Sequence, residues 1–424
     1  MKKPAINFLA VFIVTSLLSA QWTKQSFPTT ENLWKIRFAT EQAGWIAGHN
    51  YIYKTTNGGT NWTKQDTSIG ACDAMFALND QTAMFANWTG AGEVSRGIRR
   101  TTDGGTTWTT VNSEKNYYTD IDFGSATVGY ASSGGTSGNI PMVKKTTDAG
   151  ATWTTISQNF PKTKYELTGI SFVDENVGWT VTYDGFVFKT TNGGSDWALQ
   201  DSLGLNSYRD IDFFDQNYGW IVGGISGYQE LAYTTNGGTK WNKMSQGGCS
   251  TREVKIMDKY HAWYCGSFYS PFLAYIDTAG NPWKKQQFQD SSSSPDVASF
   301  DMVSTKIGYA IANLGRVYKT TNGGVASVKI EKSNIFPINY SLEQNFPNPF
   351  NPSTTVRFSI PVKEDVSLKI FSINGELIEE LIGKPMDAGS YSITWHAEGR
   401  PSGVYFYTLT SGNFSETKKL ALLK

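Results

Sequence analysis

The sequence contains little of what builds metal centres and redox sites. It has three cysteines, and its three histidines are scattered without the spacing of metal ligands. We therefore expect neither a metal nor a cofactor. Three cysteines allow at most one intramolecular disulfide. Cys249 and Cys265 are the nearest pair, but they lie on successive predicted strands and out of register, so a bond between them and buried free thiols both remain open.

The sequence also lacks an excess of charge of either sign. Its 37 lysines and arginines balance 37 aspartates and glutamates, and no polybasic stretch or acidic block occurs. Because nucleic acid and anionic membranes are attracted by clustered positive charge, we expect neither among the partners. No apolar run of membrane-spanning length follows residue 20. We therefore expect no membrane span after that point.

The first 20 residues are unusual in their apolar content. Lys2 and Lys3 precede the run FLAVFIV, and Leu18-Ser19-Ala20 places small residues before a cut. This three-part pattern is typical of a secretory signal peptide, so we assign residues 1–20 to one and predict export. A retained membrane anchor is the alternative, and no cysteine follows the cut to support a lipoprotein anchor.

What the sequence does contain favours strands and tight turns. It has 42 glycines, 14 tryptophans and 21 tyrosines, together with abundant threonine. These residues favour β-strands joined by turns over helices. We predict an all-β protein.

One phrase recurs along most of the chain. It reads TTNGGTNW, TTDGGTTW, TTDAGATW, TTNGGSDW and TTNGGTKW, with a weaker sixth copy, IDTAGNPW, and a seventh, TTNGG at 320–324, that stops before its tryptophan. The six tryptophans lie 42 to 46 residues apart. That period fits one four-stranded propeller blade. Seven copies predict a seven-bladed β-propeller over residues 21–325.

The phrase has the chemistry of a tight turn. Its Asp or Asn can accept backbone N–H bonds, its last Gly can adopt a left-handed conformation, and its Trp can pack between blades. We predict structural roles for Asn57, Gly59, Trp62, Asp103, Gly105, Trp108, Asp148, Gly150, Trp153, Asn192, Gly194, Trp197, Asn236, Gly238 and Trp241.

These copies resemble the Asp-box, Ser/Thr-x-Asp-x-Gly-x-Thr-Trp, of the propellers in sialidases, sortilin-type receptors and photosystem II assembly factors. The copies that end at Trp108 and Trp153 match every fixed position, and the others carry Asn for Asp or differ before Trp. With its GW-rich second strands, the chain most resembles the assembly-factor-like group over roughly residues 21–324. The resemblance implies the fold but not an activity, because enzymes, receptors and chaperones share the box.

The two ends of the repeat region complement each other. The seventh copy has Ser327 where a Trp is due, whereas Trp22 to Gln25 reads as an outer strand without a blade before it. We predict that this N-terminal strand pairs with Arg316–Thr320 and closes the ring, which removes exposed strand edges. The alternative is that VASVKI, residues 325–330, completes the seventh blade.

The remainder of the chain has a different pattern. After a predicted linker at residues 326–339, short β segments separated by Gly, Pro or Asn turns predict an immunoglobulin-like sandwich at 340–424. The motifs FPNPFNPSTT, SINGELI, AGSYSITW, SGVYFYTL and TKKLALLK resemble the C-terminal sorting domain of type A cargo of the bacterial type IX secretion system. The resemblance implies an address that the outer-membrane translocon reads and that is commonly cut off after passage. A plain sandwich domain with a ligand of its own is the alternative.

The predicted loops suggest a binding function. Four blades carry insertions between the second and third strands, and these loops share the face opposite the Asp-boxes. Loops on a rigid scaffold often carry binding residues. We predict that this face binds a polysaccharide or a protein ligand. The predicted ligand-binding residues are Trp88, Tyr228, Phe268, Tyr269 and Phe272. We expect the protein to pass through the periplasm and to act outside the cell or on its surface. We expect a monomer.

A glycoside hydrolase is the alternative function. Such enzymes normally need two suitably spaced carboxylates, and the candidates nearest the inner strands or in an inserted loop are Asp120, Asp210 and Glu230. The Arg-Ile-Pro signature of sialidases is absent. The phrase DIDF, which holds Asp120 and Asp210, recurs in two blades, as expected of blade architecture rather than chemistry. We therefore assign no catalytic residue.

Overall fold

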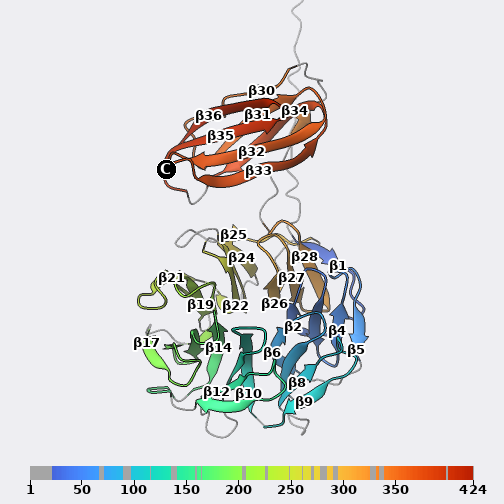
Figure 1. Ribbon diagram of the computed structural model, residues 1–424, viewed down its shortest axis with the longest axis vertical. Helices are drawn as coiled ribbons and strands as arrows, with labels where there is room; N and C mark the ends of the chain where they lie inside the picture. The colour runs from blue at the N-terminus through green and yellow to red at the C-terminus, as the bar shows by residue number, and fades with distance from the viewer. Residues whose placement is uncertain are drawn as a thin grey trace, which may run out of the picture.

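The computed structural model describes residues 22–423, except 66–70, 89–96, 115, 135–140, 158–159, 164, 203–206, 225–227, 248, 260, 269–271, 277–283, 290–294, 325–330, 334–338 and 398–399. The proposed signal peptide therefore lies outside the described residues. The described elements include nine four-stranded antiparallel sheets, seven within residues 22–320 and two within 331–422 (Figure 1). The chain is all-β in this sense, and the first seven sheets are arranged as propeller blades.

We number these seven sheets as blades 1 to 7. Blade 1 contains β2 (Leu33–Phe38), β3 (Gly44–Gly48), β4 (Ile52–Thr55) and β5 (Thr63–Gln65); blade 2 contains β6 (Ala71–Ala77), β7 (Ala83–Trp88), β8 (Gly97–Thr101) and β9 (Thr109–Asn112). Blade 3 contains β10 (Tyr117–Phe123), β11 (Gly129–Gly134), β12 (Met142–Thr146) and β13 (Thr154–Ser157); blade 4 contains β14 (Leu167–Phe172), β15 (Gly178–Thr182), β16 (Phe186–Thr190) and β17 (Ala198–Ser202).

The last three blades follow the same order. Blade 5 contains β18 (Tyr208–Phe213), β19 (Gly219–Gly223), β20 (Tyr228–Thr234) and β21 (Asn242–Gly247); blade 6 contains β22 (Cys249–Asp258), β23 (His261–Phe268), β24 (Phe272–Ile276) and β25 (Lys284–Lys285). Blade 7 contains β26 (Val297–Met302), β27 (Gly308–Ala312), β28 (Arg316–Thr320) and, from the other end of the chain, β1 (Thr23–Gln25). The first strand of each blade contacts the first strand of the next, and β26 contacts β2, so these inner strands form a closed ring.

Blade 7 is completed by the N-terminal strand. In this blade, β1 pairs with β28 in the register Thr23 opposite Lys319 and Gln25 opposite Val317. Trp22 is fully buried, and its indole N–H donates to Gln286 Oε1 at 3.1 Å. Residues 325–330, the alternative segment for completing blade 7, lie outside the described residues. The edge of β28 that they would need is occupied by β1.

Aromatic stacks join neighbouring blades at the end of the inner strands. Phe213 of blade 5 stacks on Trp179 of blade 4 with ring centroids 3.6 Å apart and meets the Asp-box Trp241 edge-on at 5.9 Å. The same arrangement occurs where Phe38 stacks on Tyr309, between blades 1 and 7, at 3.6 Å. Each stack buries large apolar surfaces in a preferred ring geometry. The stacked aromatic pair that joins blades 7 and 1 is therefore of the same kind as the pair that joins blades 4 and 5.

The Asp-box turns are stabilised by their own side chains. In the second copy, Asp103 Oδ1 accepts from the backbone N–H of Thr107 at 2.9 Å, and Asp103 Oδ2 accepts from the Thr107 hydroxyl at 2.6 Å. Gly105 has φ of 91°, a conformation that side chains rarely adopt. These hydrogen bonds hold the pKa of Asp103 down, at about 2. The carboxylate therefore stays ionised in its structural role.

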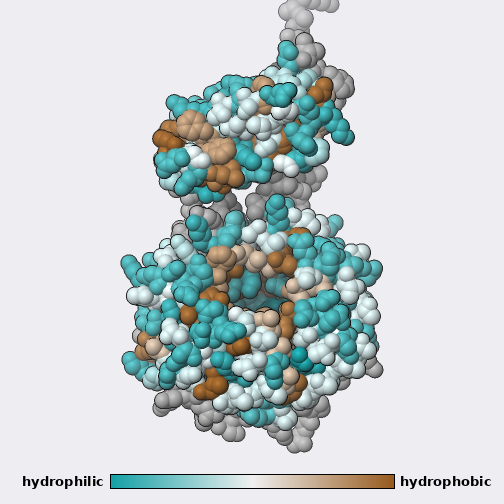
Figure 2. Space-filling model, in the orientation of Figure 1, coloured by the Kyte–Doolittle hydropathy of each residue, from teal (hydrophilic) through white to brown (hydrophobic). Residues whose placement is uncertain are grey.

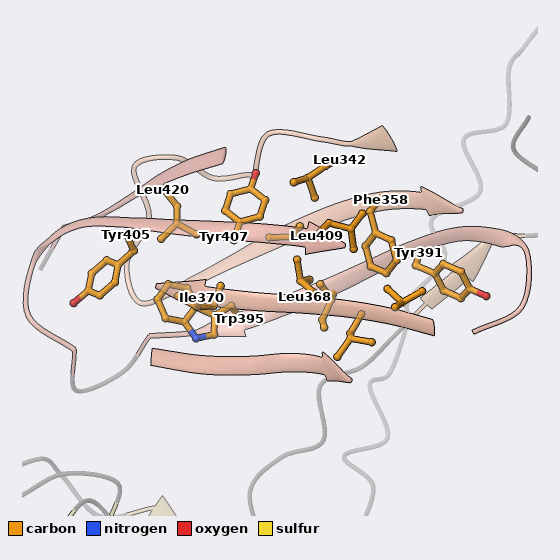
Figure 3. Packing of buried hydrophobic residues seen from close by; sticks show 14 of the residues in the cluster. Leu342, Phe358, Leu368, Ile370, Tyr391, Trp395, Tyr405, Tyr407, Leu409 and Leu420 are labelled. Atoms are coloured by element: carbon orange, nitrogen blue, oxygen red, sulfur yellow. The ribbon is translucent and has the colours of Figure 1, made fainter. Parts of the chain in front are cut away.

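Two facing sheets make up the C-terminal region. One contains β29 (Glu331–Ser333), β34 (Gly389–His396), β31 (Ser353–Ile360) and β30 (Ser341–Leu342); the other contains β33 (Leu377–Met386), β32 (Glu364–Ser372), β35 (Gly403–Ser411) and β36 (Phe414–Leu422). Alternate side chains of both sheets meet in one apolar core, which includes Phe358, Leu368, Trp395 and Leu409 (Figure 3). This alternation gives each sheet one buried face.

One detail differs from the sequence-based expectation, and another decides between two alternatives that it left open. The predicted linker contains a short strand, β29, which pairs with β34 at the edge of the C-terminal sheet, so part of the linker belongs to that region. Cys249 pairs with Phe268 across β22 and β23, whereas Cys265 pairs with Glu253. Cys265 is a buried free thiol, because these registers keep the two cysteines of blade 6 apart, and Cys72 in blade 2 is also a buried free thiol.

Candidate functional site

A β-bulge interrupts the inner strand of every blade at the same position. In blade 1 the register with β3 shifts between Leu33 and Lys35, so Trp34 is the extra residue. The equivalent shifts leave these extra residues in blades 2 to 7: Asp73, Thr119, Thr168, Arg209, Arg252 and Ala298. All seven line one cavity of about 830 Å³. Bulges re-aim side chains, and here they direct one from each blade toward the centre of the ring.

We call this cavity the mouth of the channel. Its other lining residues come from the starts of inner strands and from the turns between second and third strands, such as Tyr183 and Asn313. These connections lie on the face opposite the Asp-boxes, because successive strands of a blade run in alternate directions. Figure 2 shows a central hollow among the blades, with polar residues in its depth.

Basic and aromatic groups meet at the mouth. The Arg209 guanidinium lies over the Tyr183 ring at 5.2 Å, a cation–π contact. Next to it in the ring, Arg252 approaches Asp296 at 3.6 Å. Arg209 and Arg252 are both exposed and lie on neighbouring blades. The mouth therefore offers cationic groups and aromatic surface to a ligand.

The opposite side of the mouth carries an acid. Burial raises the pKa of Asp73, although nearby Lys35 and a hydrogen bond with Tyr117 act in the other direction. Burial, with a further contribution from Asp73, raises the pKa of Tyr117 to about 12. Asp73 and Tyr117 together form a polar pair on blades 2 and 3.

At the base of the mouth, where Lys35 and Glu253 line the cavity, one carboxylate bridges three blades. Glu253 of blade 6 reaches past blade 7 to Lys35 of blade 1, with Oε1 2.5 Å from Nζ, and Arg37 lies 3.4 Å from the same oxygen. Its Oε2 accepts from the backbone N–H of Phe300 in blade 7 at 3.1 Å. Burial would raise the pKa of Glu253, but the two cations outweigh it and hold the pKa at about 2. Ser299, with its small side chain, lies at this level in blade 7.

The other channel carboxylates connect neighbouring blades. Asp120 Oδ2 accepts from the backbone N–H of Ile170 at 3.1 Å, and Asp210 Oδ2 accepts from that of Val254 at 2.9 Å. Burial raises the pKa of both carboxyls, and the charge of Asp120 adds to the effect on Asp210. Between them in the ring lies Gly169, where an added Cβ would stand 3.0 Å from the Asp210 Cα.

Two residues further along each inner strand the pattern repeats. Asp122 Oδ2 accepts from Phe172 N at 2.6 Å, and Asp212 Oδ2 from Ile256 N at 2.8 Å. Burial raises the pKa of Asp122 to about 6. The DIDF acids thus serve as hydrogen-bond acceptors between blades. Within the described ranges, no group of three or more His, Cys, Asp or Glu side chains is placed to hold a metal ion.

The structure describes the side chain of only one of the five ligand residues predicted from the sequence. Trp88, Tyr228 and Phe268 lie at strand ends, but their side chains are outside the described residues, as is all of Tyr269. Phe272 is only 1% exposed and packs against Tyr264 at 5.5 Å. The expectation of a surface role for Phe272 therefore does not fit, because its ring belongs to the core between blades 5 and 6. Glu230, on β20, does not line the mouth.

The bulge residues were missed in the sequence, although a signal for them exists. A regular strand buries every second residue, whereas blade 1 buries Leu33 and then Ile36, three positions later. Blades 4 and 5 show the same spacing, with Leu167 before Ile170 and Tyr208 before Ile211. An apolar spacing of three inside a strand pattern indicates an inserted residue. This spacing predicts inserted residues at Trp34, Thr168 and Arg209, whereas Arg252 follows the polar Thr251 and has no such signal.

We expect Glu253→Gln to destabilise the propeller at pH 7 by about 3–5 kcal/mol, because removal of one partner leaves buried cations uncompensated. The matched control, Asp122→Asn, keeps an acceptor for Phe172 but removes a buried charge, so its effect should lie within about 1 kcal/mol of zero or be stabilising. Urea unfolding of both variants measures this difference. A loss below about 1 kcal/mol in Glu253→Gln would show that the bridge is not stabilising.

The two carboxyls should also respond to pH in opposite ways. The folded-state pKa of Glu253 is below its unfolded value, so its contribution is present above about pH 4.5 and is lost as pH falls toward 2. The folded-state pKa of Asp122 is above its unfolded value, so its protonation adds stability as pH falls from 6 toward 4. Comparing the unfolding free energy of each variant with wild type across this window separates the two.

Comparison with known families identifies the C-terminal region. Residues 344–422 match the family model of the secretion system C-terminal sorting domain. This region is a type IX sorting domain. A sorting domain implies secretion to the outer surface and contact with the translocon. Among curated proteins, none matches the chain. In the part of the chain that the structure describes, no helix has the length and apolar character needed to cross a membrane.

Solved structures resemble the propeller. A structure of YCF48 bound to a D1 peptide has a TM-score of 0.54 at 15% identity and covers 75% of this chain and 99% of that one. YCF48 from Cyanidioschyzon merolae has a TM-score of 0.53 at 16% identity, with 71% and 98% covered. The GH74 xyloglucanase from Xanthomonas campestris has a TM-score of 0.56 at 12% identity, with 80% of this chain and 59% of the enzyme covered. At these identities the likeness shows the propeller fold alone.

Proposed function

We propose that this chain is an exported seven-bladed propeller that acts as a non-catalytic binding module, carried to the cell surface by its immunoglobulin-like sorting domain at residues 340–424. The ligand is an extended segment of a partner protein, held at the mouth of the channel. The observation that carries the proposal is the convergence of seven bulged residues on one cavity of about 830 Å³. That volume lies within the range of ligand pockets, roughly 300–1,000 Å³.

The chemistry of the mouth supports a polypeptide ligand. Trp34, Tyr117 and Tyr183 provide aromatic surface, and Arg209 and Arg252 provide charged donors, which are the residue types that dominate protein interfaces. Asn32 and Asn313 add amide groups suited to a peptide backbone. YCF48, whose fold is similar, has been solved with a D1 peptide bound. We extend from that protein only the ability of such a propeller to bind a peptide.

The use of the channel carboxylates supports a role without catalysis. Each of Asp120, Asp122, Asp210 and Asp212 accepts a hydrogen bond from the backbone of the next blade. Glu253 is neutralised by Lys35 and Arg37. A general acid or base must be free to exchange a proton with a substrate. These acids are instead engaged in holding the blades together.

The test is a comparison of peptide and glycan arrays with the chain that begins at residue 21. We expect peptide hits that weaken at least tenfold, about 1.4 kcal/mol, in Trp34→Ala and in Arg209→Ala. Thr23→Ala, an exposed change on the rim of blade 7, is the control and should bind normally. Binding of peptides that survives both mouth substitutions would move the site elsewhere on the propeller.

The glycoside hydrolase alternative rests on the likeness to the GH74 enzyme and on the raised pKa of Asp73 in the mouth. A raised pKa suits a general acid. Hydrolysis of an array glycan that disappears in Asp73→Asn, or in a variant of Asp120, Asp210 or Glu230, would replace the binding proposal with the enzyme.

A further inference from the structure

Most of the surface of the sorting domain is polar. On the outer face of the sheet that contains β32, β35 and β36, Lys369, Thr408 and Thr417 lie in one row across three strands. The outer face of the other sheet is similar, since Thr355 lies opposite Thr394 and the two hydroxyls are 3.1 Å apart. Such rows of hydroxyls and charges suit contact with water.

One end of the first sheet departs from this pattern. Leu377, Phe371 and Phe406 form a row across β33, β32 and β35. Leu377 is 54% exposed, and both phenylalanines are partly exposed. Val404 lies two residues before Phe406 on β35 and therefore on the same face, because side chains alternate along a strand. Apolar side chains thus replace polar ones at one end of the same face.

Two further residues extend the apolar surface beyond the strands. Ile373 lies in the turn between β32 and β33 and is 68% exposed, and Leu423 follows β36 and is 56% exposed. The turn is fixed by Ser372, whose backbone N–H donates to Glu376 O and whose carbonyl accepts from Gly375 N. Both residues lie at the same end, since Ser372 pairs with Tyr405 and Gly403 pairs with Leu422.

These six residues form what we call the end patch: Phe371, Ile373, Leu377, Val404, Phe406 and Leu423. Figure 2 shows apolar side chains gathered at the end of the C-terminal region that carries the mark C in Figure 1. An isoleucine on a tightly bonded turn has no core to pack against. Contiguous exposed apolar groups on a soluble domain commonly mark a contact surface.

The geometry points to the end patch as the surface by which the type IX secretion machinery reads this domain, through an apolar recess on one of its proteins. The inference rests on the family match, which gives the domain its sorting role, and not on the ligand of the propeller. Five of the six residues fall within the matched range 344–422, and Leu423 follows it directly. Among the described residues of the domain, the other strongly exposed apolar side chains, Phe346 and Val362, are not part of this row.

A second copy of the chain fits the patch less well. Stable interfaces bury roughly 1,200–2,000 Å² in total, and six side chains, three of them already partly covered, supply much less. A small apolar contact with fast release suits cargo that must pass through its reader. The occupant we infer is therefore a transient protein partner.

The experiment uses the full chain, with its signal, in a host that has the type IX system. Ile373→Ser combined with Leu377→Ser removes the two exposed apolar side chains at the connection between β32 and β33, and a second variant adds Phe406→Ser. We expect surface-exposed protein to fall at least tenfold, with the product retained in the periplasm and its melting temperature unchanged. Val362→Ser, which removes an apolar side chain that is 50% exposed at the opposite end, is the control and should be exported normally.

Each outcome bears on the inference. Normal export of both patch variants overturns it, and so does an equal loss in Val362→Ser, because the effect would then not be confined to the patch. A wild-type dimer in light scattering that the double variant dissociates, with normal export, would assign the patch to a second copy. If the chain that lacks the whole domain is also exported, the sorting role itself fails. If the patch variants are exported but the chain without the domain is not, the role of the patch alone is refuted.

Discussion

Trp22→Ala is expected to destabilise the propeller by about 3–5 kcal/mol, the usual cost of truncating a fully buried tryptophan. Trp22 has no exposed surface, stacks on Phe288 at 5.7 Å and donates its indole N–H to Gln286. It anchors β1, the strand that joins the two ends of the ring. Its loss would leave both a cavity and a loosened edge on β28, which is why the effect should be large.

Thermal unfolding of the purified chain measures the effect. A loss of 1 kcal/mol shifts the melting temperature by about 2–4 °C in domains of 150–250 residues, so we expect a fall of at least several degrees. Deletion of residues 21–25 should cost more, because the backbone hydrogen bonds of β1 are lost as well. Thr23→Ala, exposed on the same strand, should have an effect within about 0.5 kcal/mol. An unchanged melting curve in the deletion would show that β1 does not close the ring.

The closing strand could be predicted because a repeat allows its parts to be counted. TKQ at 23–25 and TKQ at 63–65 are the outer strands of blades 7 and 1, and the seventh copy lacks its Trp. The period and the turn chemistry are local, so they can be read without knowledge of distant contacts. The strand β29 escaped the same reasoning, because three polar residues, Glu331 to Ser333, have no apolar pattern. Only the open edge of β34 makes them a strand.

The candidate site was less predictable for a physical reason. The long aromatic loops predicted Phe272 as a ligand-binding residue, but the fold buries its ring between two blades. The mouth is instead made by one inserted residue in each inner strand, and these residues are chemically different, from Trp34 to Ala298. Their common position depends on how each strand pairs with its neighbour. Glu253 illustrates the limit: it lies 218 residues from Lys35 in sequence, yet their side chains touch.

Removal of residues 326–424 is expected to leave a folded propeller that accumulates in the periplasm, with surface-exposed protein reduced at least tenfold in a host with the type IX system. The cut precedes β29, because that strand pairs with β34 and would otherwise lose its partner. The propeller should remain folded, since its seventh blade is completed by β1 and the ring of inner strands contains its own core. The sorting domain supplies the contact with the translocon, so its loss should stop passage across the outer membrane.

Cell fractionation and surface proteolysis measure where the truncated protein lies, and its thermal unfolding measured against the wild-type propeller transition tests the fold. The reciprocal chain, in which residues 326–424 follow an unrelated periplasmic protein, should gain surface exposure if the domain is a sufficient address. Equal display of the truncated and full chains would refute the sorting role. A truncated protein that fails to fold would instead show that the propeller depends on the C-terminal region, contrary to the closure that β1 provides within blade 7.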